Sequence, residues 1–528
     1  MIEDAGEYDF IVVGAGSAGC VVAARLSESG RHKVLLVEAG PEDKHFWIHV
    51  PLGYANVFAD PRINWMFESE PEPALYNRTM YQPRGKVLGG TSSINGMIYI
   101  RGNREDYNGW RASGCDGWGW DDVLPYFKKA EGSDGLKVAP NPVKHELAEA
   151  VLRAAQHAGL PYTPDFNGDQ QEGVGYYRFN IFKGRRWSTA KAYLEPARTR
   201  KNLRIVTGAH VSRVSAHEGR ATGVVYDKDG VTFEAKAKAE VIVSSGAFGS
   251  PKLLELSGIG DARRLSSLGI EPKLDLPSVG ENLQDHFYTQ LMFRCTKPIT
   301  INDFANSWPQ KIIEGVKYLV SRRGKLASNH LYVGGFTRST SGLDKPDIQF
   351  NMTAWSVAER TAAGAKPHPF SGFSLSPVHI NPDARGAVHI STSDSRRPAS
   401  IRFNFLESEY DMQAMIYGVR LMRTIAEQAE LRPYVAEEIQ PGPSVKTDEE
   451  IVEFLRRKAV SNLHAVGSCR MGPDRINSVV DPQLRVHGIE GLRVVDGSIM
   501  PRIVCGNTHA ATVMIAEKAS DMILSAVR

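Results

Sequence analysis

Two histidines near the C-terminal end of this 528-residue chain lie in segments that are rich in small residues. His464 opens the run HAVGSCRMG, and His509 lies in the run GNTHA. Small neighbours let an imidazole ring reach into a closed site. A neutral histidine, whose ordinary pKa is about 6.5, is suited to accept a proton near neutral pH. The pair therefore predicts a site for proton transfer, whereas most of the fifteen histidines are expected at the surface or in hydrogen-bonded core positions.

A glycine-rich turn at the other end of the chain predicts a dinucleotide cradle. Gly14, Gly16 and Gly19 follow an apolar run at 8–13 with the spacing G-x-G-x-x-G. The first glycine permits a tight turn, the second lets backbone approach a pyrophosphate, and the third allows a helix to pack closely on the strand. Glu38 lies nineteen residues further on, where a carboxylate can accept hydrogen bonds from ribose hydroxyls. The acid disfavours NADP and leaves NAD and FAD open.

Apolar runs and helical spacing indicate the elements that must position these residues. In chain order we expect a strand at 8–13, a helix ending near Gly30, strands at 34–37 and 241–243, a β-rich stretch at 380–405, a helix at 408–431, a strand at 492–495 and a helix at 509–526. The two ends of the chain thus have the same strand-then-helix pattern. This order predicts a nucleotide-binding domain assembled from both ends, with a second domain inserted.

Two longer motifs give the chain a family resemblance. Residues 85–96 read GKVLGGTSSING, and residues 246–260 read GAFGSPKLLELSGIG after an expected strand. With VGENLQDH at 279–286 and the stretch from His464 to Glu517, they resemble the glucose–methanol–choline (GMC) oxidoreductase family, whose members use FAD. Within that family the chain looks most like bacterial choline, sorbose and long-chain alcohol dehydrogenases.

The resemblance implies positions for FAD, residue by residue. The pyrophosphate is expected at Gly14, Gly16, Ser17 and Ala18, the ribose at Glu38 and Ala39, and the adenine at Val211. The ribityl chain and the isoalloxazine are expected along Gly89, Gly90, Asn95, Gly96, Met97 and Ile98, and the ribityl and phosphate region also at Asp496 and Gly497. Some family members attach FAD covalently through a histidine just before the asparagine of the GGTSSIN run. That position is Ile94 here, so FAD is expected to be bound non-covalently.

The resemblance also implies the reaction. We expect oxidation of a small-molecule alcohol to an aldehyde or ketone, with hydride transfer to flavin N5. His464 is expected to be the general base and His509 to hold the substrate oxygen. Electrons would pass to a quinone-type acceptor, a dye or oxygen. An FAD-containing lyase of the hydroxynitrile-lyase type, an oxygen-using alcohol oxidase and a non-catalytic flavin-binding protein are the alternatives.

The expected fold class is α/β, with a Rossmann-like FAD-binding domain and a substrate-binding α+β domain that has a mostly antiparallel sheet. We expect 1–155, 197–290 and 478–528 to form the FAD-binding domain, and 156–196 and 291–477 to form the substrate-binding domain.

Composition narrows the class of partner. The formal net charge of +3 argues against a nucleic-acid partner, which would require a concentrated basic face. The five cysteines lie far apart, so we expect no metal site and reduced thiols in a cytoplasmic protein. No apolar run is long enough to span a membrane, although peripheral membrane association stays open.

Overall fold

A long N-terminal strand, β1 (Ile2–Val13), lies inside a seven-stranded sheet in the computed structural model, which describes residues 2–361 and 364–527. The sheet order is β10-β2-β1-β13-β12-β11, and β28 also pairs with β13. The other strands are β2 (Val34–Val37), β10 (Leu203–Val206), β11 (Ala209–His217), β12 (Arg220–Lys228), β13 (Val231–Val243) and β28 (Leu492–Val494). The five strands β10, β2, β1, β13 and β28 run parallel, whereas β11, β12 and β13 form an antiparallel meander.

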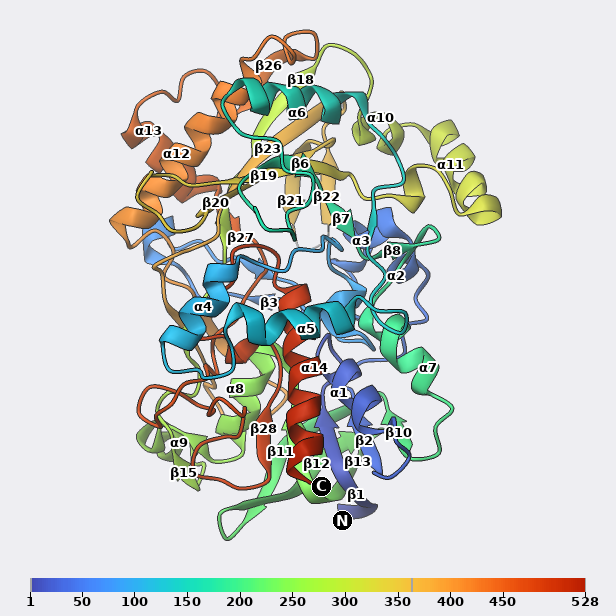
Figure 1. Ribbon diagram of the computed structural model, residues 1–528, viewed down its shortest axis with the longest axis vertical. Helices are drawn as coiled ribbons and strands as arrows, with labels where there is room; N and C mark the ends of the chain where they lie inside the picture. The colour runs from blue at the N-terminus through green and yellow to red at the C-terminus, as the bar shows by residue number, and fades with distance from the viewer. Residues whose placement is uncertain (1, 362–363, 528) are drawn as a thin grey trace.

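The two ends of the chain meet at this sheet. The C-terminal helix α14 (His509–Ala526) packs against α1 (Gly19–Leu26) and α5 (Trp120–Ala130), and Figure 1 shows it running beside β1 and β28 through the lower half of the molecule. The apolar residues of the strands pack with the inner faces of these helices in one hydrophobic core. Parallel strands buried on both faces explain why the runs at 11–13 and 34–37 are continuously apolar.

The observed elements differ from the expected ones mainly at their ends. β1 starts at Ile2 because its first residues pair with the outer part of β13, where Ile2 lies beside Thr232. α1 ends at Leu26, before the expected end near Gly30. The predicted C-terminal helix at 509–526 is confirmed at both ends.

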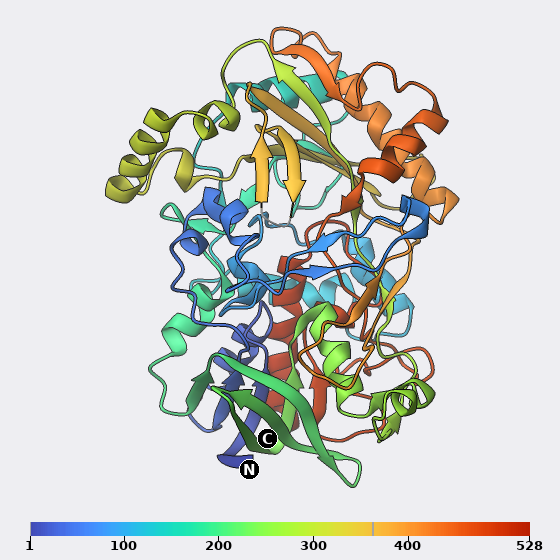
Figure 2. The ribbon, with the colours of Figure 1, turned by 180° about the vertical axis from the view of Figure 1, so that it is seen from behind.

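A second, antiparallel sheet forms the upper half of the molecule (Figures 1 and 2). Its main path is β26-β18-β23-β20-β19-β6. Of two further short strands, β17 pairs with β23, and β27 pairs with β17. The bounds are β6 (Gly173–Tyr176), β17 (Phe287–Tyr288), β18 (Leu291–Cys295), β19 (Leu331–Thr337), β20 (Ile348–Thr353), β23 (Gly372–His379), β26 (Val435–Gln440) and β27 (Val460–Ser461). The helices α6 (Glu146–His157), α12 (Glu409–Ala426) and α13 (Asp448–Lys458) share the core of this sheet.

The predicted fold class is thus confirmed: a Rossmann-like parallel sheet is joined to a domain with an antiparallel sheet. The domain limits stay a prediction. Because α6 packs in the second core, we favour a boundary before Glu146 over one at residue 155. Across the described chain, each helix is too short or too polar to cross a membrane.

Candidate active site

A cavity of about 420 Å³ lies between the two sheets, within the size range of small-molecule sites. Its lining includes every predicted cofactor residue except Gly89, together with both predicted histidines. Gly89 is buried, and its N–H donates to Ala15 O at 2.7 Å. The structure therefore brings together residues that are separated by almost the whole length of the chain.

The glycine cradle closes one end of this cavity. Gly14 has a φ of +94°, and a Cβ added there would lie 2.6 Å from the carbonyl oxygen of Ser244. A Cβ on Gly19 would lie 1.8 Å from Gly14 O. Larger residues at these positions would force the strand, turn and helix apart. The start of α1 can therefore direct backbone N–H groups toward an anionic ligand such as a pyrophosphate.

Glu38 occupies the expected position beside this cradle. One carboxylate oxygen accepts from Ala15 N at 2.9 Å and the other from Gly40 N at 2.8 Å. Burial raises the pKa of this carboxyl to about 7, against the two backbone hydrogen bonds, which lower it. A buried carboxylate held in this way can receive ribose hydroxyls, as the sequence motif predicts.

The second glycine run packs directly on the first. A Cβ on Gly90 would lie 2.6 Å from the Cα of Gly16. Asn95 is held by the buried side chain of Arg186, whose Nη1 donates to Asn95 O at 2.7 Å and to Asn95 Oδ1 at 2.9 Å. The cavity therefore continues along backbone from the Glu38 end toward the histidines. Glycine turns, a helix start and a carboxylate in this order fit a long, flat dinucleotide such as FAD.

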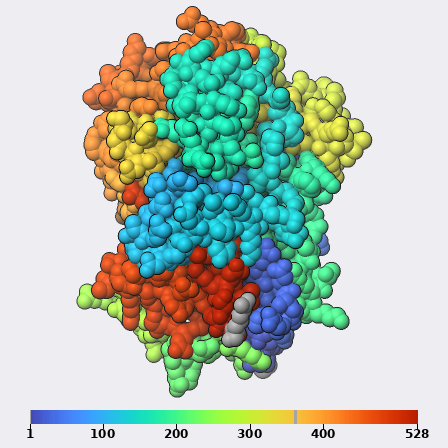
Figure 3. Space-filling model, viewed as in Figure 1, coloured from blue at the N-terminus to red at the C-terminus, as the bar shows by residue number. Residues whose placement is uncertain are grey.

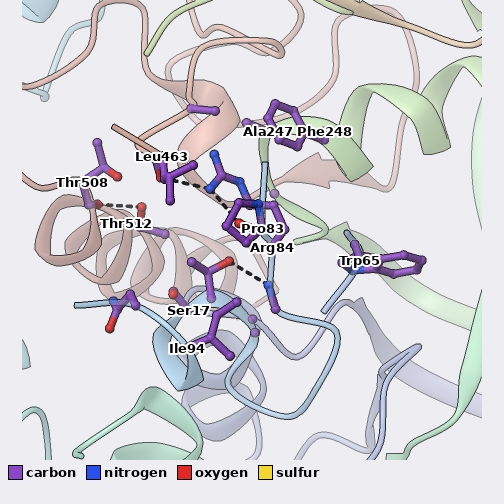
Figure 4. A pocket seen from close by; sticks show the side chains of 18 of the residues that line it. Ser17, Trp65, Pro83, Arg84, Ile94, Ala247, Phe248, Leu463, Thr508 and Thr512 are labelled. Carbon is purple, nitrogen blue, oxygen red and sulfur yellow. Dashed lines mark hydrogen bonds between the residues drawn. The ribbon is translucent and has the colours of Figure 1, made fainter. Parts of the chain in front are cut away.

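Asp496 links the cradle to the C-terminal strand. Its carboxylate accepts from Gly246 N at 2.8 Å, Ser250 Oγ at 2.6 Å and Ser498 N at 2.8 Å. The GAFGSP motif and the Asp496-Gly497 turn thus form one hydrogen-bonded unit on the cavity wall. Figure 4 shows the neighbouring part of the wall, where Arg84 reaches toward Leu463 beside Phe248, while Thr508 and Thr512 mark the start of α14.

His464 lies at the other end of the cavity, inside a cluster of polar side chains. Its Nδ1 is 2.9 Å from Nδ1 of His286, and the two rings meet nearly edge to face. Its Nε2 is 3.0 Å from Nδ2 of Asn507. Nδ2 of Asn462 lies 3.3 Å from its Nδ1. If His464 donates its Nδ1–H to His286, its Nε2 lone pair points to the side of Asn507.

Short strand pairs bring these residues together. Phe287 in β17 pairs with Ser461 in β27, and a bridge joins Gln284 to Val466. The two segments that carry His286 and His464 therefore run side by side. Asp285 fixes the second segment by accepting from the His464 N–H at 2.7 Å and from the hydroxyl of Ser461.

Burial keeps these imidazoles neutral. Burial, together with the positive charge of Arg84, lowers the pKa of His464 to about 3. The pKa of His286 is lowered well below its ordinary value by burial and by the neighbouring His464. Above this pKa His464 is neutral and one of its ring nitrogens is unprotonated, which is the state that a general base requires.

His509 lines the cavity as predicted, but another residue contacts His464. His509 is the first residue of α14, and its buried Nδ1 has no hydrogen-bond partner among the described residues. Burial, with the charge of Arg186, lowers the pKa of His509 to about 4. Asn507, two residues earlier in the same motif, reaches His464 instead. The sequence motif located the turn, but it did not show which of its two polar side chains faces His464.

His286, Asn507, Arg84 and Asn462 were not singled out from the sequence. His286 is the last residue of the VGENLQDH motif, so the motif was the available signal. Three large aromatic residues of the upper domain lie outside the cavity wall: Trp308 is exposed, and neither Tyr332 nor Trp355 lines the cavity. Tyr54, Phe58 and Tyr288 line it instead.

A dinucleotide cradle joined to a buried histidine cluster defines a class, the nucleotide-dependent oxidoreductases. The comparisons with known proteins identify the family within it. The two GMC oxidoreductase family models, for the N-terminal and C-terminal parts, match residues 8–288 and 382–516. The chain belongs to the GMC oxidoreductase family, which is FAD-dependent and acts on CH–OH donors.

Relatives of known activity agree with this assignment. The chain is 44% identical to a mitochondrial choline dehydrogenase of Mus musculus, over 98% of this chain and 89% of the relative. It is also 44% identical to an oxygen-dependent choline dehydrogenase of Rhizobium etli, over 98% and 96%.

Solved structures show the same fold. A pyridoxine 4-oxidase from Mesorbium loti matches with a TM-score of 0.87 at 30% identity, over 97% of this chain and 98% of that one. A formate oxidase of Aspergillus oryzae, described in terms of FAD modification, matches with a TM-score of 0.94 at 25% identity, over 99% of each.

Proposed function

We propose that the protein oxidises an uncharged alcohol to an aldehyde or ketone with non-covalently bound FAD, using His464 as the general base. The observation that carries the proposal is the contact of His464 Nε2 with Asn507 Nδ2 at 3.0 Å on the cavity wall. A hydroxyl group placed at these two atoms can donate its proton to Nε2 and accept from the amide. Both interactions strengthen as negative charge develops on the oxygen.

The neighbouring residues prepare His464 for this role. In the tautomer in which His286 Nδ1 accepts the Nδ1–H of His464, the Nε2 lone pair of His464 is left for the substrate. Asp285 holds the backbone of His464 beside the cavity wall by accepting its N–H. Bound FAD supplies the hydride acceptor at flavin N5. Ile94, at the cavity wall, offers no nucleophile, which supports non-covalent binding of the cofactor.

The charge of the wall favours a neutral substrate. Among the described residues that line the cavity, the acids are Glu38 and Asp496, and both carboxylates are bound to backbone N–H groups at the cofactor end. At the histidine end, none of the described lining residues carries a carboxylate. This end lies near the positive charge of Arg84, which contributes to the low pKa of His464. A cationic alcohol would lose its hydration there without gaining a counter-ion. The choline dehydrogenase relatives act on such a cation, so we expect this chain to differ from them in substrate.

A matched pair of substrates tests both parts of the proposal. We expect anaerobic stopped-flow measurements to show faster flavin reduction by 3,3-dimethylbutan-1-ol than by choline, which has the same shape and a positive charge. Faster reduction by choline would contradict the neutral-substrate proposal. Absence of reduction by every alcohol, with cleavage of a cyanohydrin, would favour the lyase alternative. Reoxidation by oxygen and by a quinone, measured in parallel, then identifies the electron acceptor, which we propose to be quinone-type.

A further inference from the structure

One helix of the upper domain has an apolar face directed at solvent. Helix α11 (Trp308–Ser321) follows the short α10 (Ile301–Ala305) and protrudes from the body of the molecule in Figures 1 and 3. Within α11, which the structure describes throughout, Tyr318 is the one buried residue. Six of the twelve exposed large apolar side chains among the described residues lie on this helix: Trp308, Ile312, Ile313, Val316, Leu319 and Val320. Such a concentration on a single element marks an interaction surface.

The sequence of α11 places its exposed apolar side chains on one side of the helix. At 100° per residue, the six apolar side chains fall within an arc of about 140° on the helix surface. Lys317 follows directly at one edge of this arc, and Lys311 lies beyond the other edge. Tyr318 falls on the opposite side, toward the protein. The helix is therefore amphipathic, but its polar side faces the protein and its apolar side faces outward.

The contacts that hold α11 do not use the apolar face. The hydroxyl of Tyr318 donates to His49 O at 3.3 Å, and its ring packs with Val50 and Ala327. Glu314 accepts from Lys325 N at 2.8 Å. The apolar side chains therefore remain available to a partner. An isolated helix of this length is only marginally stable in water, so the bracing residues fix it in position.

The charge around α11 indicates which partner fits. Residues 301–330 contain Lys311, Lys317, Arg322, Arg323 and Lys325 against two acids. Both acids are engaged inside the protein, since Asp303 caps α10 and Glu314 binds Lys325 N. An apolar strip bordered by cations matches the acyl region of a bilayer bordered by anionic headgroups.

We propose that α11 docks the protein on an anionic lipid bilayer, lying flat in the interface with its apolar arc in the acyl region and its lysines and arginines at the headgroups. The helix is about 21 Å long, too short to span the membrane. A second copy of the chain is a poorer fit, because one narrow helix face is small against the roughly 800 Å² per partner that stable dimers bury. Lysine, which supplies three of the five cations here, is also depleted from such interfaces.

The placement of α11 has a consequence for the cavity. The segment that braces it, residues 47–50, continues through the short turn Pro51–Gly53 into α3 (Tyr54–Val57), and Tyr54 and Phe58 line the cavity. A docked protein therefore holds this wall of the cavity close to the bilayer, where apolar alcohols and quinones dissolve. This consequence rests on the proposed function, whereas lipid binding itself does not.

Vesicle co-sedimentation of the flavin-loaded protein tests the docking. We expect wild type to bind phosphatidylcholine vesicles that contain phosphatidylglycerol, and to bind less as salt is raised. The triple variant Ile312→Gln, Val316→Gln and Leu319→Gln should lose at least about tenfold in bound fraction while oxidising alcohol normally with a soluble dye. Val320→Gln should weaken binding, whereas Ile476→Gln should not, although both side chains are 81% exposed.

Three results would overturn the proposal. In the first, the wild-type protein stays in the supernatant when anionic vesicles are sedimented. In the second, the triple variant binds the vesicles as well as wild type does. The third is self-association of wild type through these residues, seen by ultracentrifugation without vesicle binding, which would assign the face to a second copy.

If the triple variant fails to retain flavin, fluorescence quenching by brominated lipids tests the docking instead. Brominated lipids should quench the tryptophan fluorescence of wild type, and Trp308→Phe should remove that quenching. Absence of quenching contradicts docking.

Discussion

The two ends of the cavity are built in different ways. The cofactor end consists mainly of backbone: glycine turns, the start of α1 and a carboxylate, Glu38, fixed by two N–H groups. The histidine end consists of side chains from three distant segments, where His286, His464 and Asn507 meet within hydrogen-bond distance. One end recognises a ligand by the shape of the chain, and the other positions reactive atoms by long-range packing. Substitutions at the two ends should therefore fail in different ways.

The largest expected effect separates chemistry from cofactor binding. His464→Ala removes the proposed base and should slow anaerobic flavin reduction about 10³-fold. The cofactor end is untouched, so the purified variant should retain a full complement of FAD by absorbance. Near-normal reduction, measured by stopped flow, would remove His464 from the mechanism. Loss of FAD would show that the two ends are not independent.

Asn507→Ala should cost about 10²-fold in the same measurement, because the amide that faces the developing negative charge is lost. His509→Asn is the matched control two residues away. His509 makes no hydrogen bond to His464, so we expect less than a threefold change there. A loss of about 10²-fold in His509→Asn, with less than a threefold change in Asn507→Ala, would show that His509 holds the substrate oxygen.

His286→Phe should lower the rate of flavin reduction about tenfold, because the Nδ1–H of His464 loses its acceptor while the base remains. A purely structural role would change stability alone. The discriminating readout is the pH profile of reduction, whose acid limb should shift in His286→Phe. His286→Asn, which can still accept a hydrogen bond, should restore most of the rate. An unchanged profile with a lower melting temperature would contradict the positioning role.

Glu38→Gln should have the smallest effect, and on cofactor affinity alone. Burial raises the pKa of Glu38 to about 7 in the protein without ligand, and ribose hydroxyls favour the ionised form. FAD affinity of the wild-type apoprotein should therefore fall as the pH drops through about 7, by up to tenfold per unit. The variant should bind about threefold more weakly at pH 7 and show no such dependence. Flavin fluorescence titration measures both, and a pH-dependent variant would point to another group.

Much of this molecule was predictable from local pattern. The strand–turn–helix around Gly14, the C-terminal helix and the acid at position 38 all follow from spacing, because backbone turns and parallel strands impose strict local requirements. The choice between Asn507 and His509 was not predictable, because both are polar and two residues apart. Only the pairing of β17 with β27 and the position of α14 decide which side chain meets His464.

The orientation of helix α11 could not be predicted from its sequence either. Its sequence has the spacing of an ordinary amphipathic helix, which usually packs its apolar face on a core. The structure turns that face outward because Tyr318 binds the polar side to the protein.

The sequence by itself therefore determined the family, the cofactor class and the chemical types in the site. The tertiary structure decided which residues touch His464, which wall is charged and which helix face stays exposed. The physical reason is that turns and strand patterns depend on neighbours along the chain, whereas contacts, burial and the resulting pKa values depend on residues brought together from far apart.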